Sequence, residues 1–153
     1  MGTIKLTAVD EPLAQLLRGS DRQAVAFWAA DCAEHVLSLF ERERPSDTRP
    51  REAIEAARAW ARGEIRVGAA RTAALAAHAA ARECAGEASQ AAARAAGHAA
   101  ATAHVATHAA AVASYAVNAA GYAALAGERD WQRTHLTEIR ARLAEGDEMA
   151  GRN

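Results

Sequence analysis

Alanine dominates the middle of this chain. It occupies 31 of the 58 positions from residue 69 to residue 126, and 46 of all 153 positions. Alanine is the best helix former among the amino acids, but it buries little area per side chain. A core made from it is stable only if helices approach closely, near the short end of the roughly 8–10 Å interaxial range. The sequence therefore predicts an all-α fold, a compact bundle of about six to seven mostly antiparallel, alanine-rich helices.

Capping residues locate the first helices. Thr7 is a suitable N-cap for a helix that ends at Gly19, and Ser20 or Asp21 can cap the next one. This second helix is expected over residues 21–42. Pro50 suits the first turn of a third helix, which would follow the loop sequence ERERPSDTRP.

Breaks are needed further along the chain. Gly63 and Gly68 bracket one, and a fourth helix should run from there to residue 82. The proline-free stretch 87–126 would reach about 60 Å as a single helix, longer than a compact domain of this size. We predict a break near Thr107, with Gly97 as the alternative. A last helix is expected over 128–145, which gives one helical domain over 1–145 and a frayed tail over 146–153.

Charge and targeting patterns exclude several classes of protein. The net charge is −1 and the charges alternate in sign, unlike nucleic-acid-binding or polybasic membrane-binding chains. No signal sequence opens the chain, and charged residues interrupt the alanine-rich segment, so no membrane span is predicted. Cys32 and Cys84 form no CxxC or zinc pattern and suit the reduced state of the cytoplasm. We expect a cytoplasmic protein that needs no cofactor and binds neither nucleic acid nor membrane.

Residues other than alanine fall into two polar stripes on the alanine-rich helices. At 100° per residue, His104, His108 and Tyr115 share a face after residue 87, and Arg71 and His78 share a face of the preceding helix. The stripes are either the wet sides of these helices or the walls of a site between them. In the second case a small enzyme or small-molecule binder would use His78, His104, His108 and Tyr115, with histidine as general base and tyrosine as acid.

Two histidines have the spacing of metal ligands, but the motif is incomplete. His104 and His108 stand at i and i+4, yet the sequence HVATH lacks the glutamate of HExxH. His98 lies about 120° round the helix from His104 and about 9 Å along it, too far to join the pair. We therefore predict no metal site. Cys32, beside the acidic Asp31, is expected to be structural rather than nucleophilic.

Arginine and tryptophan offer further candidates. Arg49 and Arg51 flank Pro50, where they either belong to a solvated, self-compensating segment or clamp an acidic group. The three tryptophans fall on different predicted helices and are expected to anchor a core that otherwise lacks volume: Trp28, Trp60 and Trp131.

Several stretches together resemble a known bacterial family. They are FWAADCAEHVLSLFE, RPREAIEAARAWARGEI, ARTAALAAHAAAR and AAGHAAATAHVATHA, which span roughly residues 22 to 125. The most specific block is RPRxAIxxxRxWxxGE. These sequences resemble the Imm5-like family of small helical immunity proteins. The resemblance implies an all-α fold and a role in neutralising a toxin, whereas the segment 107–114 departs from the family pattern.

Three functions follow as alternatives. The first is an immunity-type protein that binds a protein partner, a toxin, with a binding surface drawn from Arg49, Arg51, Trp60, Arg71 and His98. The second is the small helical enzyme or ligand-binding protein described above. The third is a structural homodimer, because alanine faces permit close contact between helices.

Overall fold

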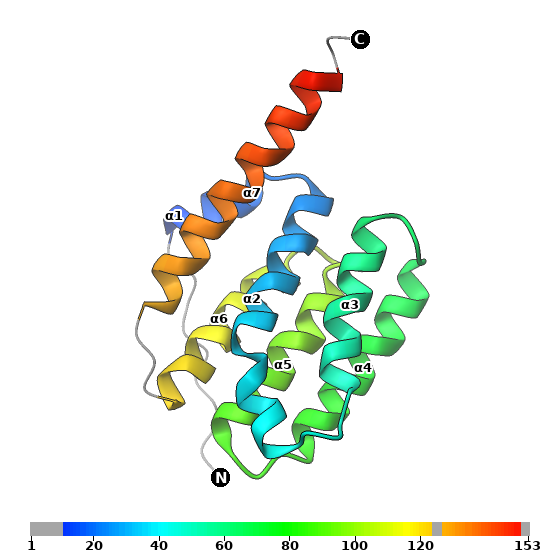
Figure 1. Ribbon diagram of the computed structural model, residues 1–153, viewed down its shortest axis with the longest axis vertical. Coiled ribbons are helices and arrows are strands. Elements are labelled where there is room, and N and C mark those ends of the chain that lie inside the picture. The colour runs from blue at the N-terminus through cyan, green and yellow to red at the C-terminus, as the bar shows by residue number, and fades with distance from the viewer. Residues whose placement is uncertain (1–10, 124–126, 151–153) are drawn as a thin grey trace.

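The computed structural model describes residues 11–123 and 127–150, with side chains as far as residue 146. In these residues the chain forms helices and turns and no strand, as Figure 1 shows. The helices of this part are α1 (Glu11–Arg18), α2 (Arg22–Glu43), α3 (Arg49–Ala61), α4 (Val67–Arg82), α5 (Glu87–Ala101), α6 (His108–Tyr122) and α7 (Glu128–Ala150). The predicted all-α bundle is confirmed.

Local signals set most of the helix ends. Asp21 caps α2, its Oδ1 atom accepting a hydrogen bond of 2.8 Å from the Ala24 backbone N–H. Pro50 lies in the first turn of α3, and Gly63 follows the same helix with a φ of +76°, which favours glycine. The predicted cap at Thr7 lies outside the described residues.

The predicted break near Thr107 is confirmed. Residues 102–107 form turns between α5 and α6. Two side chains satisfy carbonyl groups there: the Thr102 hydroxyl donates to Ala99 O at 2.6 Å, and Arg22 Nη2 donates to Ala103 O at 3.1 Å. Gly97 lies inside α5, so the alternative break at that residue is wrong.

Helix α5 is the centre of the bundle. It packs against α2, α3, α4 and α6, and nine of its 15 residues are buried. These nine are Ser89, Gly97 and seven alanines. Since none has a long side chain, the four neighbouring helices can approach the α5 backbone closely. The alanine content of this segment thus produces the close helix packing that the sequence predicts.

Helix α2 supplies much of the volume that alanine lacks. Trp28, Leu37 and Phe40 on this helix are among the largest fully buried side chains, together with Leu13, Ile54 and Leu136 from three other helices. The prediction that Trp28 anchors the core is confirmed. Trp131 packs against the core but is only partly buried, and Trp60 is partly buried without being part of this packing. These two tryptophans therefore meet solvent.

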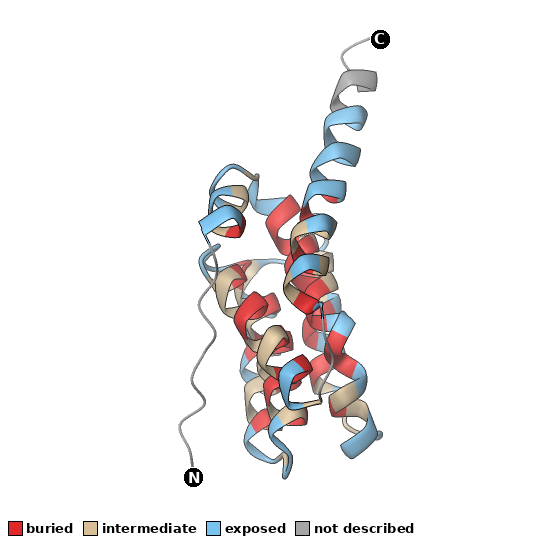
Figure 2. Cartoon of the chain, turned by 90° about the vertical axis from the view of Figure 1, so that its left-hand side faces the viewer, coloured by how far each residue is buried: buried red, intermediate tan, exposed pale blue. Residues whose placement is uncertain are grey.

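Helix α7 packs on the bundle through its first half. Trp28 Nε1 donates to the backbone carbonyl of Gln132 at 2.9 Å, and the buried Gln132 amide donates to Ala113 O of α6 at 3.0 Å. Leu136 and Ile139 complete the buried face. Residues 140–146 are all exposed, and α7 projects past the other helices (Figures 1 and 2). The predicted end at residue 145 is wrong, because the helix continues to Ala150.

None of the helices in the described residues combines the length and apolar composition that crossing a membrane requires.

Candidate functional site

Seven residues of α2, α3 and α7 form a polar and aromatic cluster at the surface. We call it the Trp131 patch. Helix α2 and helix α7 each contribute three side chains, and α3 contributes one arginine: Asp31, Glu34, His35, Arg58, Glu128, Trp131 and His135. Their spacing places them on one side of each helix, at i, i+3 and i+4 in α2 and at i, i+3 and i+7 in α7.

Two histidine–carboxylate pairs cross between α2 and α7. His35 Nδ1 lies 2.8 Å from Glu128 Oε2, and His135 Nε2 lies 2.7 Å from Asp31 Oδ2. Each of the two helices therefore contributes one histidine and one carboxylate to these pairs. The Trp131 indole stacks with both imidazoles, at centroid distances of 3.8 Å to His35 and 4.8 Å to His135. The three rings are nearly parallel, and the two carboxylates hold them in that arrangement.

Arg58 ties the acidic edge of the patch to α3. Its Nη2 atom donates to Asp31 at 2.7 Å and to Glu34 at 2.5 Å, while Nη1 donates to Glu55 at 2.7 Å. Burial works against the charged guanidinium, but its hydrogen bonds to Glu34 and Asp31 outweigh this effect and raise the pKa of Arg58. The carboxylates are thus held in place without any bound molecule.

Buried groups beneath the patch carry shifted pKa values. Burial raises the pKa of Glu128, although its contact with His35 acts in the opposite direction. Burial also raises the pKa of the Cys32 thiol well above its usual value, and the nearby carboxylates of Glu128 and Asp31 add to the effect. A thiol that stays protonated is a poor nucleophile, which agrees with the structural role expected of Cys32.

A shallow pocket of about 290 Å³ lies within the patch. It is lined by Asp31, Glu34, His35, Trp131 and His135. Negative charge and flat ring surfaces therefore meet in one concave area that solvent can reach.

Sequence reasoning missed this site. Asp31 was considered only as a neighbour of Cys32, and Trp131 was expected in the core. The available signal was the pattern of polar residues on one side of each helix, Asp31-Glu34-His35 and Glu128-Trp131-His135. Such a pattern marks any solvated helix face, and no rule of spacing shows that two such faces meet.

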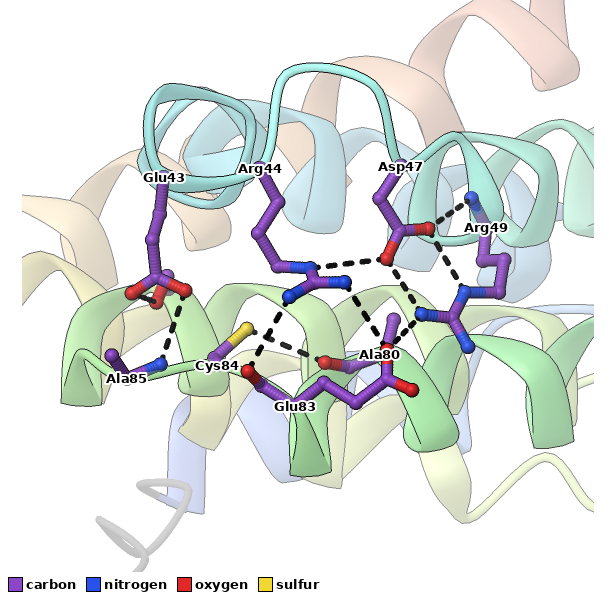
Figure 3. Close-up of polar contacts among 9 residues, drawn as sticks. Glu43, Arg44, Asp47, Arg49, Ala80, Glu83, Cys84 and Ala85 are labelled. Carbon is purple, nitrogen blue, oxygen red and sulfur yellow. Dashed lines mark hydrogen bonds and ion pairs between the residues drawn. The ribbon is translucent and has the colours of Figure 1, made fainter.

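Arg49 and Arg51, the predicted binding residues, are engaged within the molecule. Arg49 bonds Asp47 at 2.7 and 2.9 Å and also pairs with Glu83 at the end of α4, where Arg44 joins it (Figure 3). The hydrogen bonds from Arg49 hold the pKa of Asp47 far below its ordinary value, although partial burial opposes them. Arg51 binds Glu41 through two bonds of 2.8 and 2.9 Å.

Contacts of the nearby Glu43 show the structural role of the turn between α2 and α3. Glu43 accepts a hydrogen bond from the Ala85 backbone N–H group (Figure 3). At the start of α5 it also accepts hydrogen bonds from the Gly86 backbone N–H group and the Ser89 hydroxyl. Together with Arg44 and Arg49, it fastens the turn between α2 and α3 to the turn between α4 and α5. The self-compensating interpretation of this segment therefore describes Arg49 well.

Trp60 of α3 and Arg71 of α4, two other predicted binding residues, lie outside the Trp131 patch. Trp60 is partly buried, with the Arg22 guanidinium 5.3 Å from its ring centroid, a cation–π contact. Arg71 is exposed on α4.

The histidine stripes meet between α4, α5 and α6, where the rings are partly buried, in a different combination from the one expected. His78 of α4, His98 of α5 and His108 and Tyr115 of α6 form one cluster, which we call the histidine cluster. His98 Nδ1 lies 2.9 Å from His108 Nδ1, and the His98 ring stacks with Tyr115 at 5.2 Å and meets His78 edge-on at 4.8 Å. His104 is exposed in the turn and contributes no ring contact to the cluster.

The prediction that His98 stays apart from this stripe is wrong for a physical reason. The turn at 102–107 folds α6 back along α5, so residues of the two helices no longer follow one helical projection. His98 therefore reaches His108 across the helix interface rather than along a helix.

The interior of this cluster favours neutral imidazoles. Burial, with the charges of His78 and His108, lowers the pKa of His98 to about 3, and burial also lowers the pKa of His78 and of His108. His78 Nδ1 is buried without a hydrogen-bond partner. Gly97 makes room for this ring, since a Cβ atom there would lie 2.6 Å from His78 Cε1. The part of the chain that the structure describes holds no group of three or more His, Cys, Asp or Glu side chains able to bind a metal ion.

Comparison with known proteins identifies the family. A family model described as "Imm-5 like putative immunity protein" matches residues 15–139. The match ends at Ile139, the last buried residue of α7 among those described. No curated protein and no solved structure matches the chain. Because the family model covers most of the sequence, the chain belongs to the Imm5-like family of immunity proteins.

Proposed function

We propose that this protein neutralises a partner toxin by binding it, and that the Trp131 patch is the contact surface. Family membership supports an immunity-type role with a protein partner. The observation that supports the choice of surface is the preformed His35–Trp131–His135 stack, held by hydrogen bonds to Glu128 and Asp31 in a solvent-accessible pocket. Tryptophan dominates the energetics of many protein interfaces, and a side chain that is already ordered loses little entropy on binding.

The proposal places the protein in the bacterial cytoplasm, where an immunity protein would meet an incoming or newly made toxin. The cysteines of the chain support this location, because Cys32 and Cys84 are both free thiols.

Growth rescue tests the proposal. The toxin gene nearest to this gene in its genome is expressed alone and together with this protein, and cell growth and co-purification of the two chains are measured. We expect the wild-type protein to restore growth and to co-purify, and Trp131→Ala to lose both. Removing an interface tryptophan typically costs about 2 kcal/mol or more, which is about thirtyfold in affinity.

The matched control is Leu75→Ala. Leu75 is the most exposed large apolar side chain among the described residues, at 69%, and it lies on α4, which packs on α3 and α5 rather than on α7. This variant should protect cells as well as the wild type does. Protection that survives Trp131→Ala but fails with Leu75→Ala would move the contact surface to α4. Failure of the wild-type chain to protect against any toxin encoded beside it would refute the function itself.

A further inference from the structure

The Trp131 patch concentrates negative charge in a chain that is nearly neutral. The whole chain has a net charge of −1. Arg58 bonds three carboxylates around the pocket, and two more lie beside the histidines: Asp31, Glu34, Glu55, Glu128 and Glu138. Arg142 lies 4.0 Å from Glu138, and the charge of Arg129 acts on Glu128. Arg51 approaches Glu34 at 3.7 Å, but its closer bonds go to Glu41. The described lining of the pocket itself carries two carboxylates, Asp31 and Glu34, and no arginine or lysine, so the pocket attracts cations.

The carboxylates have capacity for more hydrogen bonds. Each ionised carboxylate offers about four acceptor positions. Glu34 accepts a hydrogen bond from Arg58 through its Oε2 atom, and its side chain remains 43% exposed. The Asp31 side chain is 31% exposed. Arg58 itself is only 16% exposed and approaches from α3. The solvent side of the same carboxylates is thus open to a second donor.

The aromatic rings of the patch favour a planar donor group. His35 lies on the indole of Trp131 and is itself 42% exposed, so the stack of rings ends at solvent next to Glu34 and Asp31. A guanidinium group is planar, stacks on aromatic rings and bonds a carboxylate with two parallel N–H groups. An ammonium group is compact and strongly hydrated, and it has no flat surface with which to extend a stack of rings.

We infer that the Trp131 patch receives an arginine side chain of the partner, which continues the ring stack and donates to Glu34 and Asp31. The Arg58 contacts illustrate the fit, since one guanidinium nitrogen already bridges these two carboxylates from the other side. This inference rests on the proposed function and specifies the chemistry of its partner, a basic protein surface that carries an exposed arginine.

The test needs only this protein and small probes. N-acetyl-arginine amide and N-acetyl-lysine amide are titrated separately into the ¹⁵N-labelled chain, and the indole N–H signals of the three tryptophans are followed by NMR. We expect a saturable shift of the Trp131 signal with the arginine probe, a weaker one with the lysine probe, and no shift of the buried Trp28.

Charge removal at the patch provides the second arm. Glu34→Gln should weaken binding of the arginine probe about threefold to tenfold, because a charge-assisted hydrogen bond is lost. Glu87→Gln removes the same charge from the exposed first turn of α5 and should leave binding unchanged. The inference is overturned if Trp131 does not respond to the arginine probe, if the lysine probe binds equally well, or if the two variants weaken binding equally.

Failure of this inference and failure of the proposed function give different results. If growth rescue depends on Trp131 but the arginine probe does not bind, the toxin is bound without an arginine in this pocket. If the probe binds at Trp131 but no adjacent toxin is neutralised, the pocket recognises arginine in another setting.

Discussion

At the scale of single residues, helices α4, α5 and α6 pack around a few partly buried rings. His78 lies against the backbone of α5 at Gly97, where any side chain atom would collide with it. His98 lies between Tyr115 and His108 and has a strongly lowered pKa. Both features follow from the same cause, which is that alanine-rich helices approach closely enough to enclose imidazole rings.

The contact between Gly97 and His78 gives a prediction in which the sign changes with the background. Gly97→Ala should destabilise the protein by up to about 2 kcal/mol, since overpacking of about 1–3 kcal/mol outweighs the gain of about 1 kcal/mol in helix propensity. In a His78→Ala background the same change should stabilise by about 0.5–1 kcal/mol, because the collision is gone. Urea unfolding of the four proteins measures both effects. Equal effects in the two backgrounds would contradict the contact.

The histidine cluster predicts a loss of stability in acid. His98 has a folded-state pKa of about 3, below the ordinary value of 6.5, so the unfolded chain binds a proton that the folded chain does not. Stability attributable to His98 is complete above pH 6.5 and is lost as the pH falls toward 3. The slope should reach about 1.4 kcal/mol per pH unit for this one group.

Denaturant unfolding at a series of pH values measures this slope, and His98→Phe should reduce it, because phenylalanine can stack with Tyr115 but does not titrate. Direct NMR titration of the His98 ring gives the decisive reading. Protonation of His98 near pH 6.5 in the folded protein would contradict the prediction.

At the scale of elements, the two halves of α7 differ in how far they are buried. Its first half carries the buried Gln132, Leu136 and Ile139, while residues 140–146 are all exposed. The family match ends at residue 139, at the same boundary. The part of α7 that packs on the bundle is therefore the part shared with the family.

A pair of leucines on α7 tests this division. Leu136→Ala should cost about 2–5 kcal/mol, because Leu136 is fully buried and its removal leaves a cavity. Leu143→Ala, on a side chain that is 40% exposed, should cost less than about 1 kcal/mol. Helix propensity changes equally in the two variants, so the difference reports packing alone. Similar losses in both would mean that the second half of α7 is also packed.

At the scale of the whole molecule, helix α5 sets the spacing of its neighbours. Four helices pack on it, and its buried residues are small on every side. The dimensions of the bundle therefore depend on alanine at positions that have no direct role in any site.

This dependence predicts a strong positional effect of leucine. Ala96→Leu should destabilise the protein by about 3 kcal/mol, the upper end of the usual range for overpacking, because Ala96 is fully buried in the central helix. Ala69→Leu, at an exposed position of α4, should change stability by less than about 0.5 kcal/mol, since alanine and leucine have similar helix propensities. Thermal unfolding compares the two. A well-tolerated leucine at residue 96 would show that α5 has free space beside it.

The sequence alone determined the fold class, most helix ends, the break near Thr107 and the role of Trp28 in the core. These depend on local causes: helix propensity, capping by Asp21, proline in a first turn, and the length limit on a single helix. It also indicated the family through motifs spread along the chain. The site was different. The residues of the Trp131 patch are separated by up to about a hundred positions, and each of its helix faces alone resembles an ordinary solvated surface.

Only the tertiary structure decided which polar faces meet. The fold brought α7 onto α2, and this contact placed two histidines, two carboxylates and an indole in one cluster. It also turned α6 back along α5, which joined His98 to His108 and left His104 outside. Hydrogen bonds and ring stacking depend on distances of 3–5 Å between side chains, and such distances are set by helix packing, which no spacing along the sequence specifies.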